Sequence, residues 1–362
     1  MKVQRQLAAL PRGTAACIGA FDGLHLGHQS LLRRAAALQP RVALVTFDPH
    51  PARILAPDRA PSLLQTPAQR ERVCTALGID SLVLLPFTRE MASMEPSLFV
   101  EQILIAGLRP SAVVVGEDFR FGAGRRGGTK ELAALLRPAG IDLAIASELK
   151  LDGGDAVTAN TDTHTTGIGK STGPPTKIGS SAIRAALRAG QVAAIPAHLG
   201  RTFAIEGKVV RGAGRGRGLG VPTANIAYGD VLLPRTGVYA AALQVVDRRS
   251  PLYGDRWPAA ANLGTNPTLR DDAAAAKSLE VHALDVDLGE RLYGLEVEVG
   301  LFERLRDEVR FADLDHLKTA IAGDLNTSRR LVDFAAMAAF WPPPPLVALR
   351  DPGTPATRRG LR

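Results

Sequence analysis

The sequence predicts an α/β domain with a doubly wound parallel sheet, followed by a small antiparallel β-barrel with a C-terminal helix. In the first half, short apolar runs alternate with helical stretches, which is typical of buried parallel strands. After Gly200, strand-like runs are separated by Gly, Pro and Asp turns, and no long helix is expected before Leu314. The length of 362 residues also suits two domains, because single cores usually stop growing below about 250–300 residues.

The first domain is expected to contain five strands joined by helices. The strands are Thr14–Gly19, Val42–Phe47, Leu82–Phe87, Ala112–Val115 and Ile141–Ala146. The helices are His28–Leu38, Pro67–Leu77, Ser97–Leu108 and Lys130–Leu136. Ligands of such sheets bind beyond the carboxyl ends of the strands. Gly19–His28, Phe47–Pro51 and Gly116–Gly122 all follow strands and are therefore candidate binding segments.

The second domain follows a change in composition. Residues 151–177 are rich in Gly, Thr and Pro without periodicity, which predicts a flexible insertion, and Ser180–Ala189 is expected to be a helix capped by serine. Later strands are expected at Phe203–Val210, Gly237–Val246, Leu279–Asp285 and Leu295–Leu301, with a helix at Leu314–Leu325. The domains are placed at 1–190 and 191–330, and the Pro- and Arg-rich extension 331–362 is expected to be largely disordered.

The composition favours a protein of a reducing compartment that binds anionic ligands. Cys17 and Cys74 lie in apolar stretches and are too few for a disulfide framework. No apolar run approaches the roughly 18 residues that span a bilayer, and the N-terminus lacks a signal-like apolar region, so a cytoplasmic location is expected. The net charge of +8 suits nucleotides or nucleic acid, but only 5% of the residues are aromatic, which disfavours single-stranded nucleic acid.

The segment GAFDGLHLGH, from Gly19 to His28, has the features of a phosphate site. A glycine after a strand lets the backbone approach a ligand, and a helix that begins near the histidines offers free N–H groups and a positive dipole end. His25 and His28 can donate to phosphate oxygens as a phosphorus centre is attacked. Two alternatives are a zinc pair, which lacks further ligands at suitable spacing, and two core histidines.

The motif Gly19-x-Phe21-Asp22-Gly23-x-His25-x-Gly27-His28 resembles the signature of cytidylyltransferase-like nucleotidyltransferases. TFDPHP (46–51), VGEDFRFG (115–122) and IGSSAIR (178–184) follow in order. Together they are similar to the FAD synthetase module of the prokaryotic bifunctional riboflavin kinase/FAD synthetase family. In the third motif, Gly179 and Ser181 replace the family's serine and threonine.

This resemblance implies that His25, His28 and Arg184 act in adenylyl transfer. It also implies that ATP is bound by Gly19, Phe21, Asp22, Gly23, Gly27, Asp118, Phe119, Arg120, Ser180 and Ser181. Taken as isolated features, Asp118 could be a turn residue and Arg184 a solvated helix charge.

A second phosphate-binding pattern runs from Gly207 to Asn225. Bare backbone amides and arginines in the glycine-rich loop can wrap phosphates, although a flexible linker is an alternative. A Rossmann fingerprint is unlikely here, because no parallel strand–helix unit surrounds the loop. Thr223 and Asn225 then offer hard oxygen atoms on one face of an extended segment, which suits magnesium held jointly with phosphates.

This stretch resembles the riboflavin kinase loop, and the pieces at 262–268, 279–282, 293–294 and 305–311 also match that family. The resemblance implies that Thr223 and Asn225 hold Mg²⁺ and that Glu280 is the base for the ribityl 5′-hydroxyl. It further implies ATP binding by Gly207, Lys208, Gly212, Arg217, Gly220 and Pro222, and flavin binding by Asn266 and Arg306. Val221 and Leu269 stand where the family usually has phenylalanine.

The alternation in SLEVHALD supports the role of Glu280. If Leu279 and Val281 fill the barrel, Glu280 faces the other side. The alternative is an ordinary solvent-facing carboxylate.

The resemblance implies two reactions, with ATP, riboflavin, FMN and FAD as small-molecule partners and neither nucleic acid nor membrane expected. The second module phosphorylates riboflavin to FMN with ATP and Mg²⁺, and the first transfers AMP from ATP to FMN, giving FAD and pyrophosphate. A single-activity enzyme with one working module is the alternative. A basic, non-enzymatic nucleic-acid-binding protein is a third reading, based on the +8 charge and the arginines of the tail.

Overall fold

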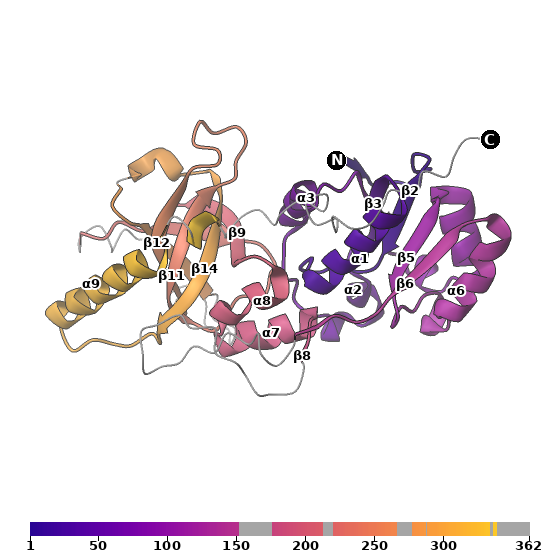
Figure 1. Ribbon diagram of the computed structural model, residues 1–362. Coiled ribbons are helices and arrows are strands. Elements are labelled where there is room, and N and C mark those ends of the chain that lie inside the picture. The colour runs from indigo at the N-terminus through magenta and orange to yellow at the C-terminus, as the bar shows by residue number, and fades with distance from the viewer. Residues whose placement is uncertain (152–175, 213–219, 266–276, 287, 334–335, 339–362) are drawn as a thin grey trace. The chain divides into compact units, whose positions relative to one another are not determined.

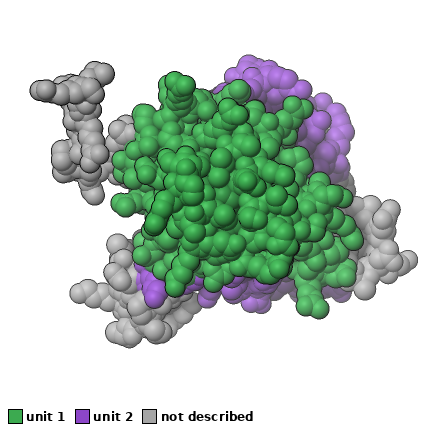
Figure 2. All heavy atoms as spheres, turned by 90° about the vertical axis from the view of Figure 1, so that its right-hand side faces the viewer, with its two compact units in different colours: residues 1–61, 70–149, 343–362 green, residues 62–69, 150–342 purple. Residues whose placement is uncertain are grey.

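The computed structural model describes residues 1–151, 176–212, 220–265, 277–286, 288–333 and 336–338 (Figure 1). These residues belong to two compact units, shown in green and purple in Figure 2. Unit 1 contains residues 1–61 and 70–149, and unit 2 contains 62–69 and 150–342. Unit 2 thus takes up a short segment from early in the chain. It also includes the helix at 180–189, which the sequence-based boundary assigns to the first domain.

Unit 1 is built on a six-stranded parallel sheet with the order β1-β4-β3-β2-β5-β6. The strands are β1 (Lys2–Gln4), β2 (Thr14–Ile18), β3 (Arg41–Asp48), β4 (Ser81–Pro86), β5 (Ala112–Gly116) and β6 (Asp142–Ala146). The edge strand β1 is too short and polar to have been predicted. Every residue of β2 is buried, as expected for a central strand between two helix layers.

Helices cover both faces of this sheet (Figure 1). The longer ones are α1 (Leu26–Leu38), α3 (Pro67–Ala76), the π-type helix η2 (Phe99–Leu108) and α6 (Thr129–Leu136). The shorter helices are α2 (Pro51–Leu55), η1 (Pro57–Arg59), α4 (Arg89–Ala92), α5 (Pro96–Leu98), η3 (Ala123–Arg125) and η4 (Arg137–Ala139). Ala16 and Ile18 pack with η2 and α6, whereas the Cys17 thiol donates to the Leu31 carbonyl of α1. The predicted doubly wound fold is confirmed.

The central strand also defines where ligands of unit 1 should bind. Strand β2 pairs with β3 on one side and with β5 on the other. The chain therefore leaves β2 in one direction and returns to its opposite side later, which makes β2 the topological switch point. The segments that follow β2, β3 and β5 meet at one edge of the sheet, and they are the three candidate binding segments of the sequence.

Unit 2 contains a closed antiparallel barrel with the strand order β10-β13-β12-β11-β14-β9. The strands are β9 (Phe203–Val210), β10 (Ala224–Tyr228), β11 (Gly237–Val245), β12 (Arg256–Thr265), β13 (Lys277–Ala283) and β14 (Glu296–Arg306). Leu279, Val281 and Tyr239 lie in its buried core. No strand was predicted for the five-residue β10, nor for β12, where RWPAAANLGT has few β-branched residues and an internal proline.

The helices of unit 2 depart from the prediction in two places. The N-cap of α7 (Ser180–Ala189) is Gly179, and no side chain caps the helix, so the predicted serine cap is wrong. Ser180 is already helical, one residue past the capping position. Helix α9 (Leu314–Leu331) runs beyond the predicted end, and Val332 and Met337 after it are buried beside β11 residues. The rest of the expected disordered tail, 339–362, lies outside the described residues.

Five further short elements of unit 2 lie before the barrel, within it or at the ends of the insertion. The helices η5 (Val192–Ala194) and α8 (Pro196–Leu199) follow α7, and η7 (Gly289–Leu292) follows β13. Most of the predicted insertion lies outside the described residues. Its two ends form the antiparallel strands β7 (Lys150–Leu151) and β8 (Thr176–Lys177).

The segment 62–69 is an integral part of unit 2. Leu63 forms a parallel bridge with Val231 and accepts from the Leu232 N–H, while Leu64 is buried in the barrel core. The Thr66 hydroxyl donates to the Glu206 carboxylate. Backbone pairing, apolar packing and polar contacts therefore all fasten this segment to the barrel.

Both cysteines are free and buried, as expected. Burial raises the pKa of the Cys17 thiol, which keeps it protonated. Across the described ranges, no helix combines the length and apolar character needed to cross a membrane.

Candidate active sites

The turn after β2 is held in an unusual conformation. Phe21, Gly23 and Leu24 all have positive φ angles, of 48°, 86° and 43°. Such angles are rare for Phe and Leu and persist only where the surroundings enforce them. The Thr46 hydroxyl on β3 donates to the Ala20 carbonyl at 2.9 Å, which ties the turn to the neighbouring strand. The chain can then begin α1 directly above the sheet edge.

The two histidines of this turn form one packed unit. His25 is the N-cap of α1, and its Nδ1 accepts from the His28 backbone N–H at 3.3 Å. The two rings stack with centroids 3.6 Å apart, and the Phe21 ring meets His28 edge-on at 5.0 Å. Because His25 supplies its own side chain as a cap, the sequence GLHLGH begins a helix without the usual Ser, Thr, Asp or Asn.

His28 is neutral at physiological pH. Burial of its ring and the charge of the neighbouring His25 lower the pKa of His28 well below its usual range. A neutral imidazole donates one hydrogen bond at the helix N-terminus without bringing a full positive charge. The zinc alternative finds no support: in the part of the chain that the structure describes, no group of three or more His, Cys, Asp or Glu side chains is arranged to hold a metal.

The segment after β5 forms a second tight turn at the same sheet edge. The Phe119 N–H donates to the Gly116 carbonyl at 3.1 Å, and the Phe119 and Phe121 rings stack 5.7 Å apart. A Cβ on Gly128 would lie 2.9 Å from the Arg120 guanidinium, so this glycine leaves room for the arginine. Asp118 and Arg120 thus follow the strand next to β2, on the edge where His25 and His28 lie.

Arg184, the predicted arginine of the third motif, belongs to α7 in unit 2. It is only 8% exposed, and its Nε donates to the Ser62 carbonyl at 3.0 Å. The reading of Arg184 as a solvated helix charge is therefore wrong. Ser180 and Ser181 precede it in the first turn of the same helix.

The predicted metal ligands and base of the second site come together on the outer face of the barrel. Asn225 of β10, Glu280 of β13 and Asn262 of β12 are direct register partners on three adjacent strands. Along β13 the burial alternates, with Leu279 and Val281 in the core and Glu280 half-buried on the other face, as the sequence predicted. The Thr223 hydroxyl donates to Glu280 Oε2 at 3.3 Å.

Glycines shape the backbone around this row. A Cβ on Gly212 would lie 2.0 Å from Asn225 Nδ2, so only glycine lets the loop pass this close to the Asn225 side chain. A Cβ on Gly207 would lie 2.5 Å from the Ala227 carbonyl oxygen, in the β9–β10 pair. Lys208 is exposed on β9, and Gly220 has a φ of +75°. Arg217 and Asn266 lie outside the described residues.

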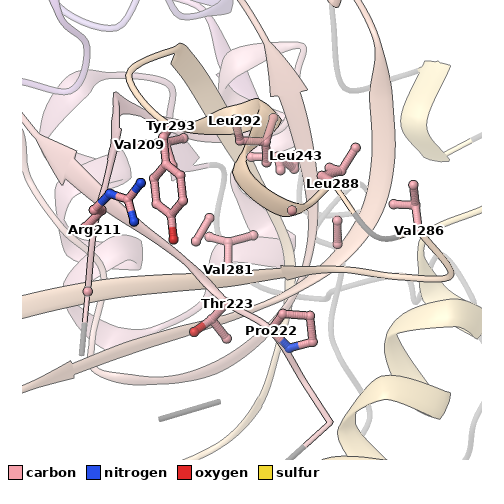
Figure 3. Close-up of a pocket in the computed structure, with 14 residues that line it drawn as sticks. Val209, Arg211, Pro222, Thr223, Leu243, Val281, Val286, Leu288, Leu292 and Tyr293 are labelled. Carbon is pink, nitrogen blue, oxygen red and sulfur yellow. The ribbon is translucent and has the colours of Figure 1, made fainter. Parts of the chain in front are cut away.

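A cavity of about 470 Å³ opens beside the Thr223 loop (Figure 3). Its apolar wall comes from β9, β11, β13 and η7, while Arg211, Pro222, Thr223 and Tyr293 bring polar atoms to it. The Arg211 guanidinium lies 4.8 Å from the centre of the Tyr293 ring and pairs with Glu290 at 3.4 Å. The apolar wall was not predicted, because nothing in the sequence distinguishes residues such as Leu288 and Leu292 from residues of the hydrophobic core.

Arg306, predicted to bind flavin, joins β14 to α9. Its guanidinium forms a bidentate pair with Asp324, with N–O distances of 2.7 to 3.1 Å. It also lies over the Phe311 ring at 5.4 Å. Because Val238 pairs with both Asn262 and Arg306, the row that begins at Asn225 and Glu280 continues across the barrel to Arg306 and α9.

Comparisons with known proteins match two successive parts of the chain to two families. Residues 7–159 match the family model of FAD synthetase, and residues 199–332 match that of riboflavin kinase. The chain is 36% identical over 324 residues to a bifunctional riboflavin kinase/FMN adenylyltransferase of Escherichia coli K12, covering 88% of this chain and 92% of that relative. A Bacillus subtilis relative with the same description is 31% identical over 313 residues, covering 85% and 89%.

A solved structure has the same overall fold. It is described as a macrolide-efflux protein from Streptococcus pneumoniae, is 25% identical, and aligns with a TM-score of 0.73 over 89% of this chain and 96% of that one.

Proposed function

The chain belongs to the family of bifunctional riboflavin kinases/FMN adenylyltransferases, and on this premise we propose that it makes FAD in two ATP-dependent steps. Riboflavin is first phosphorylated on the barrel of unit 2, and the resulting FMN is then adenylylated at the sheet edge of unit 1. The observation that carries the proposal is the contact between Thr223 and Glu280, which joins a hard-oxygen ligand to a carboxylate on the barrel face.

In the kinase step, Glu280 accepts the proton of the ribityl 5′-hydroxyl as that oxygen attacks the γ-phosphorus of ATP and ADP leaves. One carboxylate oxygen is oriented by Thr223, and the side chain stands on a strand rather than a loop, which fixes its direction. The row from Glu280 through Asn262, past the buried Val238, to Arg306 is the proposed flavin track, with polar side chains at both ends for the ribityl chain and flavin ring.

Magnesium fits the donors at Thr223 and Asn225. The Thr223 hydroxyl hydrogen is directed to Glu280, so its lone pairs remain available to a cation, and the absence of a side chain at Gly212 leaves room for the Asn225 amide. Hard oxygen donors of this type suit Mg²⁺ shared with nucleotide phosphates. When bound, the ion would neutralise charge that develops on the transferred phosphoryl group.

The adjacent cavity is the proposed site of the ATP base. Its volume of about 470 Å³ lies within the range of small-molecule pockets, and its apolar wall with a few polar groups is typical of them. Arg211 and Tyr293 present a stacked cation and ring at the wall. The resemblance to riboflavin kinases assigns the ATP phosphates to the segment after Gly207, of which residues 213–219 lie outside the described residues.

In the adenylyl transfer, an FMN phosphate oxygen attacks the α-phosphorus of ATP and pyrophosphate leaves. The α1 N-terminus and the neutral His28 donate to phosphate oxygens, and no protein nucleophile is needed. The family motif assigns Arg184 to the same reaction. The free buried cysteines agree with a cytoplasmic enzyme.

A time course tests the proposal as a whole. Purified full-length protein is incubated with riboflavin, ATP and MgCl₂, and flavins are separated by chromatography. FMN should appear first and FAD later. Accumulation of FMN alone would leave a single-activity kinase, and no turnover of riboflavin would reject the kinase assignment.

A further inference from the structure

Two side chains of strand β13 form hydrogen bonds with the loop before β10. His282 Nδ1 lies 2.7 Å from the Pro222 carbonyl oxygen, a short hydrogen bond. A carbonyl oxygen can only accept, so Nδ1 of His282 carries the proton and donates. Two residues earlier on the same face, Glu280 accepts from Thr223. Alternate residues of one strand therefore hold consecutive residues of the loop.

The position of this hydrogen bond explains why a side chain, and not the backbone of β13, bonds to the Pro222 carbonyl. The β10–β13 ladder pairs Ala224 with Val281 and Asn225 with Glu280, so Pro222 lies ahead of the first recorded pair. The imidazole of His282 supplies the partner that the next ladder hydrogen bond would otherwise provide. His282 is half-buried, and its hydrogen bond is shorter than the 3.3 Å contact between Thr223 and Glu280.

We infer that His282 is a positioning residue of the kinase site: by holding the Pro222 carbonyl, it fixes where the Thr223 hydroxyl meets Glu280. This inference rests on the kinase function proposed above. Its hydrogen bond goes to Pro222 and not to the proposed ligands Thr223 and Asn225, so His282 acts through the Pro222–Thr223 segment. Small displacements of positioned groups reduce rates strongly, because near-attack geometry is lost.

Three variants of His282 in the full-length protein test the role. His282→Asn keeps an N–H donor near the position of Nδ1, whereas His282→Gln places its amide farther out, near that of Nε2. His282→Leu removes the donor with similar bulk. We expect Gln and Leu to lower kcat for FMN formation by roughly tenfold, as for the loss of one hydrogen bond, and to raise the Mg²⁺ concentration for half-maximal rate. His282→Asn should recover most of the rate.

Internal controls separate positioning from general damage. Formation of FAD from supplied FMN is measured in each preparation and should stay at the wild-type rate. The KM for riboflavin should also hold, because His282 does not contact the flavin track. His316→Leu is the matched control: His316 is an exposed histidine of the same unit, and its ring pairs with Asp313 at the start of α9, away from the proposed kinase residues named above.

The possible results separate the kinase function from the positioning role of His282. If wild-type protein forms no FMN, the proposed function fails. If it does, and His282→Gln and His282→Leu match the wild type, the inference is overturned while the function stands. Equal losses in His282→Asn and His282→Gln would also overturn it, since the donor at Nδ1 would then not be the property that matters. Should His282→Leu fold poorly, the Asn and Gln pair decides alone.

Discussion

The substitution Glu280→Gln tests the kinase base most directly. Glutamine has the same shape, and its side-chain oxygen can still accept from Thr223 Oγ1, so the 3.3 Å contact on the barrel face survives. What disappears is the carboxylate that takes the proton of the ribityl hydroxyl. General base catalysis contributes typically 10²–10⁴-fold, so kcat for FMN formation should fall by about that factor, or roughly 3–5 kcal/mol in activation free energy.

Stability should change little by comparison. Glu280 is half-buried and has one long hydrogen bond to Thr223, so the free energy of unfolding should fall by no more than about 1 kcal/mol. The assay follows FMN by chromatography under saturating ATP and Mg²⁺, with FAD formation from supplied FMN as the internal reference. A variant that retains more than a third of the wild-type kcat, with normal adenylyl transfer, would show that Glu280 is not the base.

Three other substitutions probe the remaining parts. Because the pKa of His28 is lowered in the folded protein, the unfolded state binds a proton near pH 6.5 and the folded state does not, so the free energy of unfolding falls as the pH drops below about 6.5. The Tm measured between pH 7.5 and 5 should therefore decline more in the wild type than in His28→Asn. Parallel declines in the two proteins would contradict this. Gly212→Ala places a Cβ against the Asn225 amide, so FMN formation should fall about tenfold while adenylyl transfer is unchanged. If the variant needed the same Mg²⁺ concentration for half-maximal rate as the wild type, the proposed magnesium ligands would be wrong. Asp324→Asn replaces the bidentate partner of Arg306, so the riboflavin KM should rise several-fold with a loss of about 1 kcal/mol in unfolding free energy, whereas an unchanged KM would separate Arg306 from the flavin.

The fold could be predicted where the hydrophobic period was regular. The central strands β2 and β3 are continuous apolar runs and were found within about one residue of their ends. β1, β10 and β12 were not predicted, because the first two are only three and five residues long and the third is rich in alanine. Their pairing depends on neighbouring strands, which local sequence does not encode.

The site residues were predictable by pattern, and their contacts were not. The alternation along β13 correctly placed Glu280 on the outer face. No periodicity could show that Arg184 is buried against Ser62, since a helical arginine has the same pattern whether solvated or paired. The apolar cavity wall escaped notice for the same reason, because residues that line a pocket and residues that fill a core have the same composition.

The segment 62–69 has a practical consequence for dividing this enzyme. A cut near residue 190 would send the barrel to one fragment and Leu64, a member of its core, to the other. The barrel fragment would then expose the apolar surface that Leu64 covers and the backbone of Val231 that pairs with Leu63, and both favour aggregation. The domain is discontinuous in sequence, so a stable stand-alone kinase should be designed with residues 62–69 grafted back through a linker rather than by simple truncation.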